Sequence, residues 1–267
     1  MSEAILVTSD DGTRLRLVRA GVGPPVVLVH GTMGGKGDWF EVSRRLSADF
    51  QVTAFDRRGR GDSGDGPGYS IEREIEDVLA VIGASGPPVR LVGHSFGAIL
   101  SLLVAARAGD RIERLVLYEP PVGVGQPAAD TWLDELDRVV ATGDLDSAVR
   151  RFAAGAGITD AELQTIGGND RVWAGLRDAV RTAGREIRGA RAALPIDEGV
   201  LESISVPTLV LLGDEQDHPT YDGVGRLADR LPVGRLEHVP GHHLALVFAP
   251  DAFVAVLRSF LIDEHQA

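Results

Sequence analysis

The chain has 267 residues, 44% of them hydrophobic and 25% charged, a composition that is typical of a globular protein and excludes a disordered or fibrous one. The absence of cysteine excludes disulfides, thiolate metal sites and a cysteine nucleophile. A formal net charge of −12 argues against a nucleic-acid partner, because phosphate binding needs clustered positive charge. The apolar runs are far shorter than the ~20 residues of a membrane span, and residues 1–4 do not resemble a signal peptide, so we expect a cytoplasmic protein without a membrane partner.

Short β-type runs alternate with helical patterns along most of the chain, which favours an α/β fold with a mainly parallel central sheet flanked by helices. The run 26–29 is apolar throughout, which indicates a strand buried on both faces. In chain order, strands are predicted at residues 15–18, 26–29, 52–55, 89–92, 115–117, 209–212 and 236–239. Helices are predicted at residues 39–46, 71–82, 96–106, 224–231 and 252–261.

One segment breaks this alternation, since residues 122–194 contain no convincing strand. They contain three short helical patterns instead, at residues 132–140, 148–152 and 172–180. We expect a helical cap, residues 122–194, inserted after the sixth strand of a core domain that comprises residues 1–121 and 195–267. The cap should form a lid over the site. Its large apolar residues could line an acyl pocket, although for each of them packing between lid and core is the alternative: Trp132, Leu136, Phe152, Trp173 and Leu176.

The sequence Gly93-His94-Ser95-Phe96-Gly97 stands between a predicted strand and a predicted helix. Gly-x-Ser-x-Gly in this context is typical of a nucleophile elbow, a tight turn that strains the serine backbone and lifts its hydroxyl clear of the sheet. Side chains at Gly93 and Gly97 would collide with the neighbouring strand and helix. The helix N-terminus behind Ser95 also offers free N–H groups to a developing anion. Ser95 is therefore the candidate nucleophile.

With this elbow the chain resembles the α/β-hydrolase family, in its serine-nucleophile branch with a helical lid, over nearly its whole length. His30-Gly31-Thr32 is similar to the family's oxyanion loop, and residues 56–63 are similar to its Asp-x-Arg-Gly-x-Gly-x-Ser loop. The resemblance implies an oxyanion hole made by the backbone N–H groups of Phe96 and of Thr32, with Met33 as the alternative to Thr32. It implies no cofactor and no metal, because acyl chemistry needs only a nucleophile, a base and the hole.

A serine hydroxyl is a weak nucleophile and needs a neighbouring base. The segment 239–244 is similar to the one that carries the base in the family, and alignment on Pro250 places the base at His243 rather than His242. A metal site at this histidine pair is not favoured, because no carboxylate or further histidine has ligand spacing nearby. We expect His30 to brace the oxyanion loop and His94 to be structural.

The carboxylate that orients the base departs from the usual pattern. The common position in the family, in the loop after the predicted strand 209–212, holds Gln216, and the flanking Asp214 or Asp217 could serve instead. The haloalkane-dehalogenase-like branch of the family places its acid after the preceding strand, where this chain has Glu119 followed by two prolines. We favour Glu119, then Asp217, then Asp214. The alternative for Glu119 is a surface residue that caps the insertion.

The arginines of the 56–63 loop could suggest an anionic substrate. In the family this loop packs below or beside the site, and Asp56 and Asp62 can pair with Arg57, Arg58 and Arg60. We therefore expect these arginines to be structural.

Together, Ser95, His243 and Glu119 predict a serine hydrolase that cleaves a small ester, lactone or thioester through an acyl-enzyme. A C–C bond hydrolase, a lyase or a cofactor-free cyclase could use the same serine and histidine, because a fold does not fix its chemistry. A third hypothesis is a non-catalytic protein that binds a small molecule. The expected partner is a small-molecule substrate, and the expected state is a monomer or homodimer.

Overall fold

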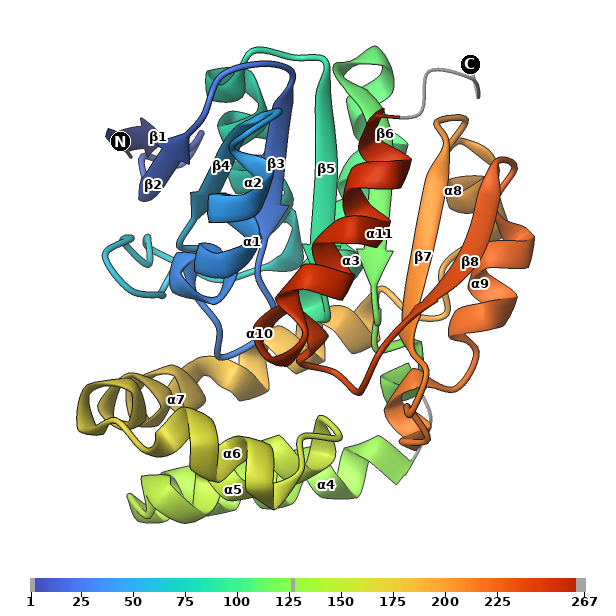
Figure 1. Ribbon diagram of the computed structural model, residues 1–267. Helices are drawn as coiled ribbons and strands as arrows, with labels where there is room; N and C mark the ends of the chain where they lie inside the picture. The colour runs from blue at the N-terminus through green and yellow to red at the C-terminus, as the bar shows by residue number, and fades with distance from the viewer. Residues whose placement is uncertain (1–2, 126–127, 263–267) are drawn as a thin grey trace.

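The core of the protein is one eight-stranded sheet, seen in a computed structural model that describes residues 3–125 and 128–262 (Figure 1). Residues 1 and 2 of the N-terminal segment considered above lie outside the described residues. The strand order is β1-β2-β4-β3-β5-β6-β7-β8, antiparallel between β1, β2 and β4 and parallel from β4 to β8. The strands are β1 (Glu3–Thr8), β2 (Arg14–Ala20), β3 (Pro25–Val29), β4 (Gln51–Phe55), β5 (Val89–His94), β6 (Ile112–Tyr118), β7 (Thr208–Gly213) and β8 (Gly234–Val239).

Helices cover both faces of this sheet (Figure 1). One face packs against α1 (Phe40–Leu46), α10 (Ala245–Phe248) and α11 (Pro250–Ile262). The other packs against α2 (Ile71–Ser85), α3 (Phe96–Ala108), α8 (Glu198–Glu202) and α9 (Val224–Arg230). Short 3-10 helices lie at Lys36–Trp39 (η1), Gly109–Arg111 (η2), Val122–Gly125 (η3) and Pro219–Tyr221 (η4).

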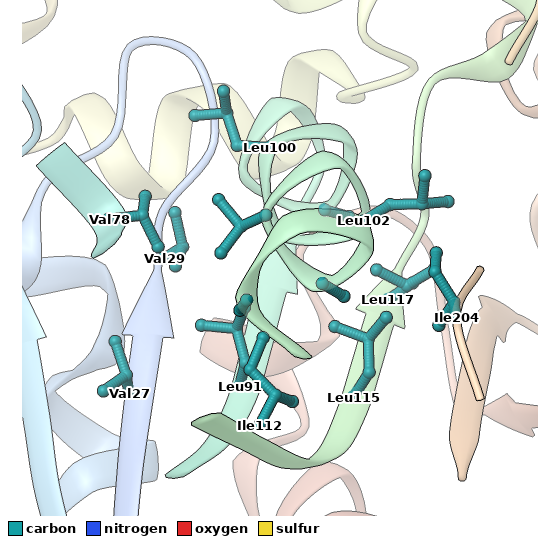
Figure 2. Packing of buried hydrophobic residues seen from close by; sticks show 14 of the residues in the cluster. Val27, Val29, Val78, Leu91, Leu100, Leu102, Ile112, Leu115, Leu117 and Ile204 are labelled. Atoms are coloured by element: carbon teal, nitrogen blue, oxygen red, sulfur yellow. The ribbon is translucent and has the colours of Figure 1, made fainter. Parts of the chain in front are cut away.

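The apolar run in β3 is explained by burial on both faces. Val27 and Val29 belong to the cluster that includes α2 and α3, whereas Val26 and Leu28 belong to the cluster that includes α1 and α11. Figure 2 shows the first cluster, where side chains of β3, β5 and β6 meet those of α2 and α3. Because burying each such side chain contributes about 1.5–3 kcal/mol, the two clusters together fix the sheet between its helices.

Every predicted strand and helix of the sheet and its flanks is present, and the expected mainly parallel sheet is confirmed. The structure adds β1, to which the sequence analysis assigned no strand. This strand lies at the edge of the sheet and pairs only with β2 among the described strands. Its residues alternate between exposed and half-buried, so its apolar signal is weaker than that of the central strands.

Between β6 and β7 the chain leaves the sheet and forms further helices, which lie beyond the carboxyl ends of the parallel strands (Figure 1). Four of them, here called the α4–α7 helices (residues 128–192), share an apolar cluster of their own, to which the core contributes Met33. They are α4 (Ala128–Thr142), α5 (Leu145–Gly155), α6 (Asp160–Gly167) and α7 (Asp170–Ala192).

The sequence patterns identified three of these four helices and missed α6. This helix buries a single residue, Leu163, so it has almost no apolar stripe. A usable signal was present at its start, where the Thr159 side chain accepts from Glu162 N and the Glu162 carboxylate accepts from Thr159 N. Such a reciprocal pair is a capping box, and it marks a helix N-terminus in sequence. Within the described ranges, none of the helices combines the length and apolar character that crossing a bilayer requires.

Candidate active site

Ser95 lies in the sharp turn between β5 and α3. Its φ of 56° and ψ of −124° place a non-glycine residue in a sparsely populated region, which is the strain expected of a nucleophile elbow. A Cβ at Gly93 would lie 2.4 Å from Gly97 O, and one at Gly97 would lie 2.4 Å from Val29 O. The steric reason given above for the two glycines is therefore confirmed.

Glu119 directly follows β6, and its buried carboxylate faces the His243 ring. Glu119 Oε2 lies 2.7 Å from His243 Nδ1 and also accepts from Gln216 Nε2 at 2.9 Å. The other oxygen, Oε1, accepts from Gly213 N at 2.8 Å. Because an ionised carboxylate only accepts hydrogen bonds, we assign the imidazole proton to Nδ1, which leaves Nε2 free to take a proton.

The alternative residues for these two positions lie elsewhere. His242 Nε2 is 3.3 Å from the exposed Glu215 carboxylate. Asp214 Oδ1 accepts from Gly241 N at 2.8 Å, so it holds the turn that precedes the histidines. Asp217 is exposed. The structure thus brings Glu119 to His243.

Two neighbours fix the backbone around His243. The His94 ring stacks on Tyr118, with 5.0 Å between ring centroids, and its Nε2 is 3.0 Å from His243 O. Burial lowers the pKa of His94 well below its usual value, so its neutral ring donates this bond and takes no part as a charge. The Tyr118 hydroxyl donates to His242 O at 2.5 Å and accepts from Ala245 N at 3.2 Å. The expected structural role of His94 is confirmed.

The backbone groups expected to form the oxyanion hole lie beside Ser95. Phe96 is the first residue of α3, so its N–H precedes the first hydrogen bond of the helix. Thr32 follows Gly31, at which a Cβ would lie only 2.9 Å from Ser95 Cβ. The loop that carries the Thr32 N–H therefore passes directly over the nucleophile.

His30 braces this loop as expected. Its Nδ1 lies 2.8 Å from Gly31 O, and its Nε2 accepts from Arg57 N at 3.0 Å. Burial lowers the pKa of His30 well below its usual value, so the ring is neutral and can donate at one nitrogen while accepting at the other. The oxyanion loop is thereby tied to the end of β4.

The arginines of the 56–63 loop are paired inside the protein, but with partners other than those expected. Asp56 and Asp62 both bind Lys36, so the expected pairing of these carboxylates with the arginines is wrong. The arginines bind carboxylates from α2, α7 and the β1–β2 turn, which only the tertiary fold brings near. These carboxylates are Glu74, Asp77, Glu186 and Asp11.

Arg57 links α7 to the catalytic elbow. Its guanidinium is fully buried, pairs with the equally buried Glu186 of α7 and lies 4.7 Å from the centroid of the Phe96 ring. Arg57 N also donates to His30 Nε2, and His30 braces the loop that carries the Thr32 N–H. Arg57 therefore contacts Phe96, one predicted oxyanion donor, and the residue that holds the loop of the other.

Two cavities meet at Ser95. The smaller, about 360 Å³, is lined by Ser95 and His243, and the larger, about 710 Å³, by Ser95 and Phe96. Three of the five apolar residues that we considered as pocket lining border these cavities, namely Trp132, Phe152 and Leu176. The other two, Leu136 and Trp173, do not. Leu136 is fully buried among the α4–α7 helices, and Trp173 Nε1 donates to Asp146 at 2.7 Å.

The sequence analysis did not single out several apolar residues that line the smaller cavity, because each alone reads as ordinary core: Leu163, Ile166, Leu246 and Val247. Among the residues that the structure describes, no group of three or more His, Asp or Glu side chains could hold a metal ion.

A model of the alpha/beta hydrolase family matches residues 26–256. The chain belongs to the alpha/beta hydrolase family. A solved structure of an alpha/beta hydrolase from Sphaerobacter thermophilus DSM 20745 is 35% identical, with a TM-score of 0.82, over 96% of this chain and 100% of that one. The resemblance and the fold predicted from the elbow and the two loops are confirmed.

Two curated relatives are named after reactions. A pyrrolizixenacetamide deacetylase from Xenorhabdus hominickii is 28% identical over 254 residues, which cover 91% of this chain and 93% of that protein. The N-formylmaleamate deformylase of Pseudomonas putida is 33% identical over 154 residues. That match spans 55% of this chain and only 58% of the deformylase. These relatives support a hydrolase function.

Proposed function

We propose that this alpha/beta hydrolase is a serine hydrolase that cleaves small acyl compounds through an acyl-enzyme on Ser95. The observation that carries the proposal is the buried Glu119–His243 pair, whose Oε2 and Nδ1 atoms are 2.7 Å apart, together with the cavity that His243 and Ser95 both line. A base, its orienting carboxylate and an elbow serine around one cavity are the parts that acyl transfer requires.

In the proposed reaction, His243 Nε2 takes the proton of Ser95 Oγ as Oγ attacks the carbonyl carbon. The backbone N–H groups of Phe96 and Thr32 stabilise the oxyanion, and losing one such donor typically costs about 3 kcal/mol. His243 then protonates the leaving group, and the acyl-enzyme remains. Water, deprotonated by the same imidazole, then attacks the acyl carbon. The bond to Ser95 Oγ breaks, the imidazolium returns its proton to Oγ, and the acid is released. Glu119 stabilises the imidazolium in both steps.

We further propose that residues 122–194 act as a cap on a core domain of residues 1–121 and 195–267. Both cavities at Ser95 are lined by residues of the α4–α7 helices together with residues of the core, which supports this division. A substrate bound there would be enclosed from both sides, and closure of this kind excludes water from the chemistry.

The substrates that we propose are small carboxylic esters, lactones or thioesters. The names of the two curated relatives favour a second candidate, small N-acyl compounds, since one is an N-formyl deformylase and the other an acetamide deacetylase. The same machinery serves both classes, because His243 can protonate a nitrogen or an oxygen leaving group.

A fluorophosphonate serine probe and a substrate panel test the proposal. We expect the probe to label the wild-type protein, and p-nitrophenyl esters, lactones or matched anilides to be hydrolysed. In water enriched in oxygen-18, one labelled oxygen should enter the released acid, which separates hydrolysis from lyase or cyclase chemistry. If the folded protein neither reacts with the probe nor turns over any member of the panel, the proposal fails.

Glu119→Gln should lower turnover by at least ~10²-fold. The change keeps the shape of the side chain, but it removes the charge that stabilises the imidazolium and allows the wrong tautomer. Asp214→Asn and Asp217→Asn are matched controls, each expected to lose less, and steady-state kcat on one ester checks all three. An Asp217→Asn variant that falls further than Glu119→Gln would show that the acid is misassigned.

A further inference from the structure

We infer that the two cavities at Ser95 divide the substrate, with the leaving group in the smaller cavity and the acyl group in the larger one. The inference rests on the proposed acyl-enzyme function and names its substrate class: an acyl group that carries polar groups, joined to an apolar alcohol or phenol.

The residues that line only one of the two cavities indicate which part of the substrate enters which cavity. Both cavities reach Ser95 and Thr32, but His243 lines the smaller cavity and Phe96 lines the larger. The atom that leaves must receive its proton from His243, so it has to come within hydrogen-bond reach of the imidazole, ~2.6–3.2 Å. The group attached to that atom then extends into the cavity that His243 borders.

The geometry of the tetrahedral intermediate places the remaining group. Its carbon carries four substituents, namely Ser95 Oγ, the oxyanion, the leaving group and the acyl chain. The oxyanion faces the N–H groups of Phe96 and Thr32, and the leaving group faces His243. The acyl chain takes the direction that is left, which is the larger cavity on the Phe96 side.

The smaller cavity suits an apolar leaving group. Its two acidic lining residues already have partners, because Asp38 Oδ2 accepts from Gly35 N at 3.2 Å and the Glu41 carboxylate binds Arg44 and Arg45. The rest of its wall is largely aliphatic and comes from α5, α6, α7, α10 and the loop after α5: Val149, Ile158, Leu163, Ile166, Leu176 and Leu246. Binding an apolar alcohol against such a wall removes apolar surface from water, which is favourable in free energy.

The lining of the larger cavity is mostly apolar, but it includes charged side chains of both signs. Arg150 and Asp160 line it from the α4–α7 helices, and His218 and Asp222 line it from the core. The Arg150 guanidinium stacks over the Trp173 ring, 5.3 Å from its centroid, which leaves its N–H groups available for hydrogen bonds. Donors and acceptors among these lining residues favour an acyl group with hydrogen-bonding substituents over a plain alkyl chain.

Two matched substitutions test the division. Ile166→Trp narrows the smaller cavity from α6, and Ala154→Trp narrows the larger one from α5; Ile166 is half-buried and Ala154 exposed, so both changes spare the core. For the wild type and each variant, kcat/KM is measured on methyl acetate, hexyl acetate and methyl 6-hydroxyhexanoate. Circular dichroism and turnover of methyl acetate show that the variants are folded. If one is not, Ile166→Phe replaces Ile166→Trp and Ala154→Phe replaces Ala154→Trp.

We expect Ile166→Trp to lower kcat/KM for hexyl acetate at least tenfold relative to methyl acetate and to leave methyl 6-hydroxyhexanoate within threefold. Ala154→Trp should lower kcat/KM for methyl 6-hydroxyhexanoate at least tenfold relative to methyl acetate and leave hexyl acetate within threefold. In the wild type, 6-hydroxyhexyl acetate should be at least tenfold poorer than hexyl acetate. The opposite pattern, or equal losses on both esters in both variants, overturns the division while Ser95-dependent turnover still supports the proposed function. Absence of Ser95-dependent turnover in the wild type contradicts the proposed function itself, and the division falls with it.

Discussion

Ser95→Ala should lower turnover by 10⁴-fold or more and leave the stability of the fold within ~1 kcal/mol of wild type. Ser95 is half-buried and lines both cavities, so the change deletes one oxygen without opening a hole in the core. Without that oxygen no acyl-enzyme can form, and loss of the nucleophile typically removes nearly all the catalysis that the triad supplies. Turnover of one ester and the thermal midpoint of unfolding measure the two effects.

Ser101→Ala is the matched control for this variant, because Ser101 lies on α3, is fully buried and lines neither of the two cavities at Ser95. We expect it to keep turnover within about threefold and to react with the fluorophosphonate probe. A Ser95→Ala protein that hydrolyses esters within tenfold of the wild-type rate would rule out the serine mechanism.

His243→Ala should also lower turnover by ~10⁴-fold, whereas His242→Ala should stay within fivefold of wild type. Only the His243 ring bonds to the buried Glu119 carboxylate, and the His242 ring faces the exposed Glu215. Removing the base leaves Ser95 with no group to take its proton, so the loss should match that of the nucleophile. The comparison is of kcat on one ester at pH 8. If His242→Ala is inactive and His243→Ala active, the assignment by spacing to Pro250 is wrong.

The parts of the site that depend on nearby residues could be predicted from the sequence. The elbow follows from Gly93, Ser95 and Gly97, because steric limits within one turn select those residues. The choice of His243 over His242 used the resemblance of segment 239–244 to the family's base-carrying segment and its alignment on Pro250. In each case the informative contacts lie within a few residues, so a linear pattern carries them.

The parts that depend on tertiary packing could not be predicted in the same way. Glu119 stayed one of three candidates, because the segments after β6, β7 and β8 come together only when the sheet forms. One carboxylate partner of Arg57, Glu186, lies 129 residues along the chain, in a helix whose position no local pattern gives. The lining of the smaller cavity was missed for the same reason, since Leu163 is apolar like any core residue.

The buried Arg57–Glu186 pair also bears on how a substrate can enter. Pulling α7 away from the core would take Glu186 from the buried Arg57 and Arg60 and leave Arg57 with only its longer contact to Glu74. Removing one partner of a buried ion pair typically costs about 3–5 kcal/mol. At tenfold per 1.4 kcal/mol, such a detached state would be ~10²–10⁴ times rarer than the closed one. We therefore expect substrate entry and product release to depend on smaller rearrangements of α4, α5 and α6. In this view α7 stays fixed to the core and forms one side of the entrance to the active site.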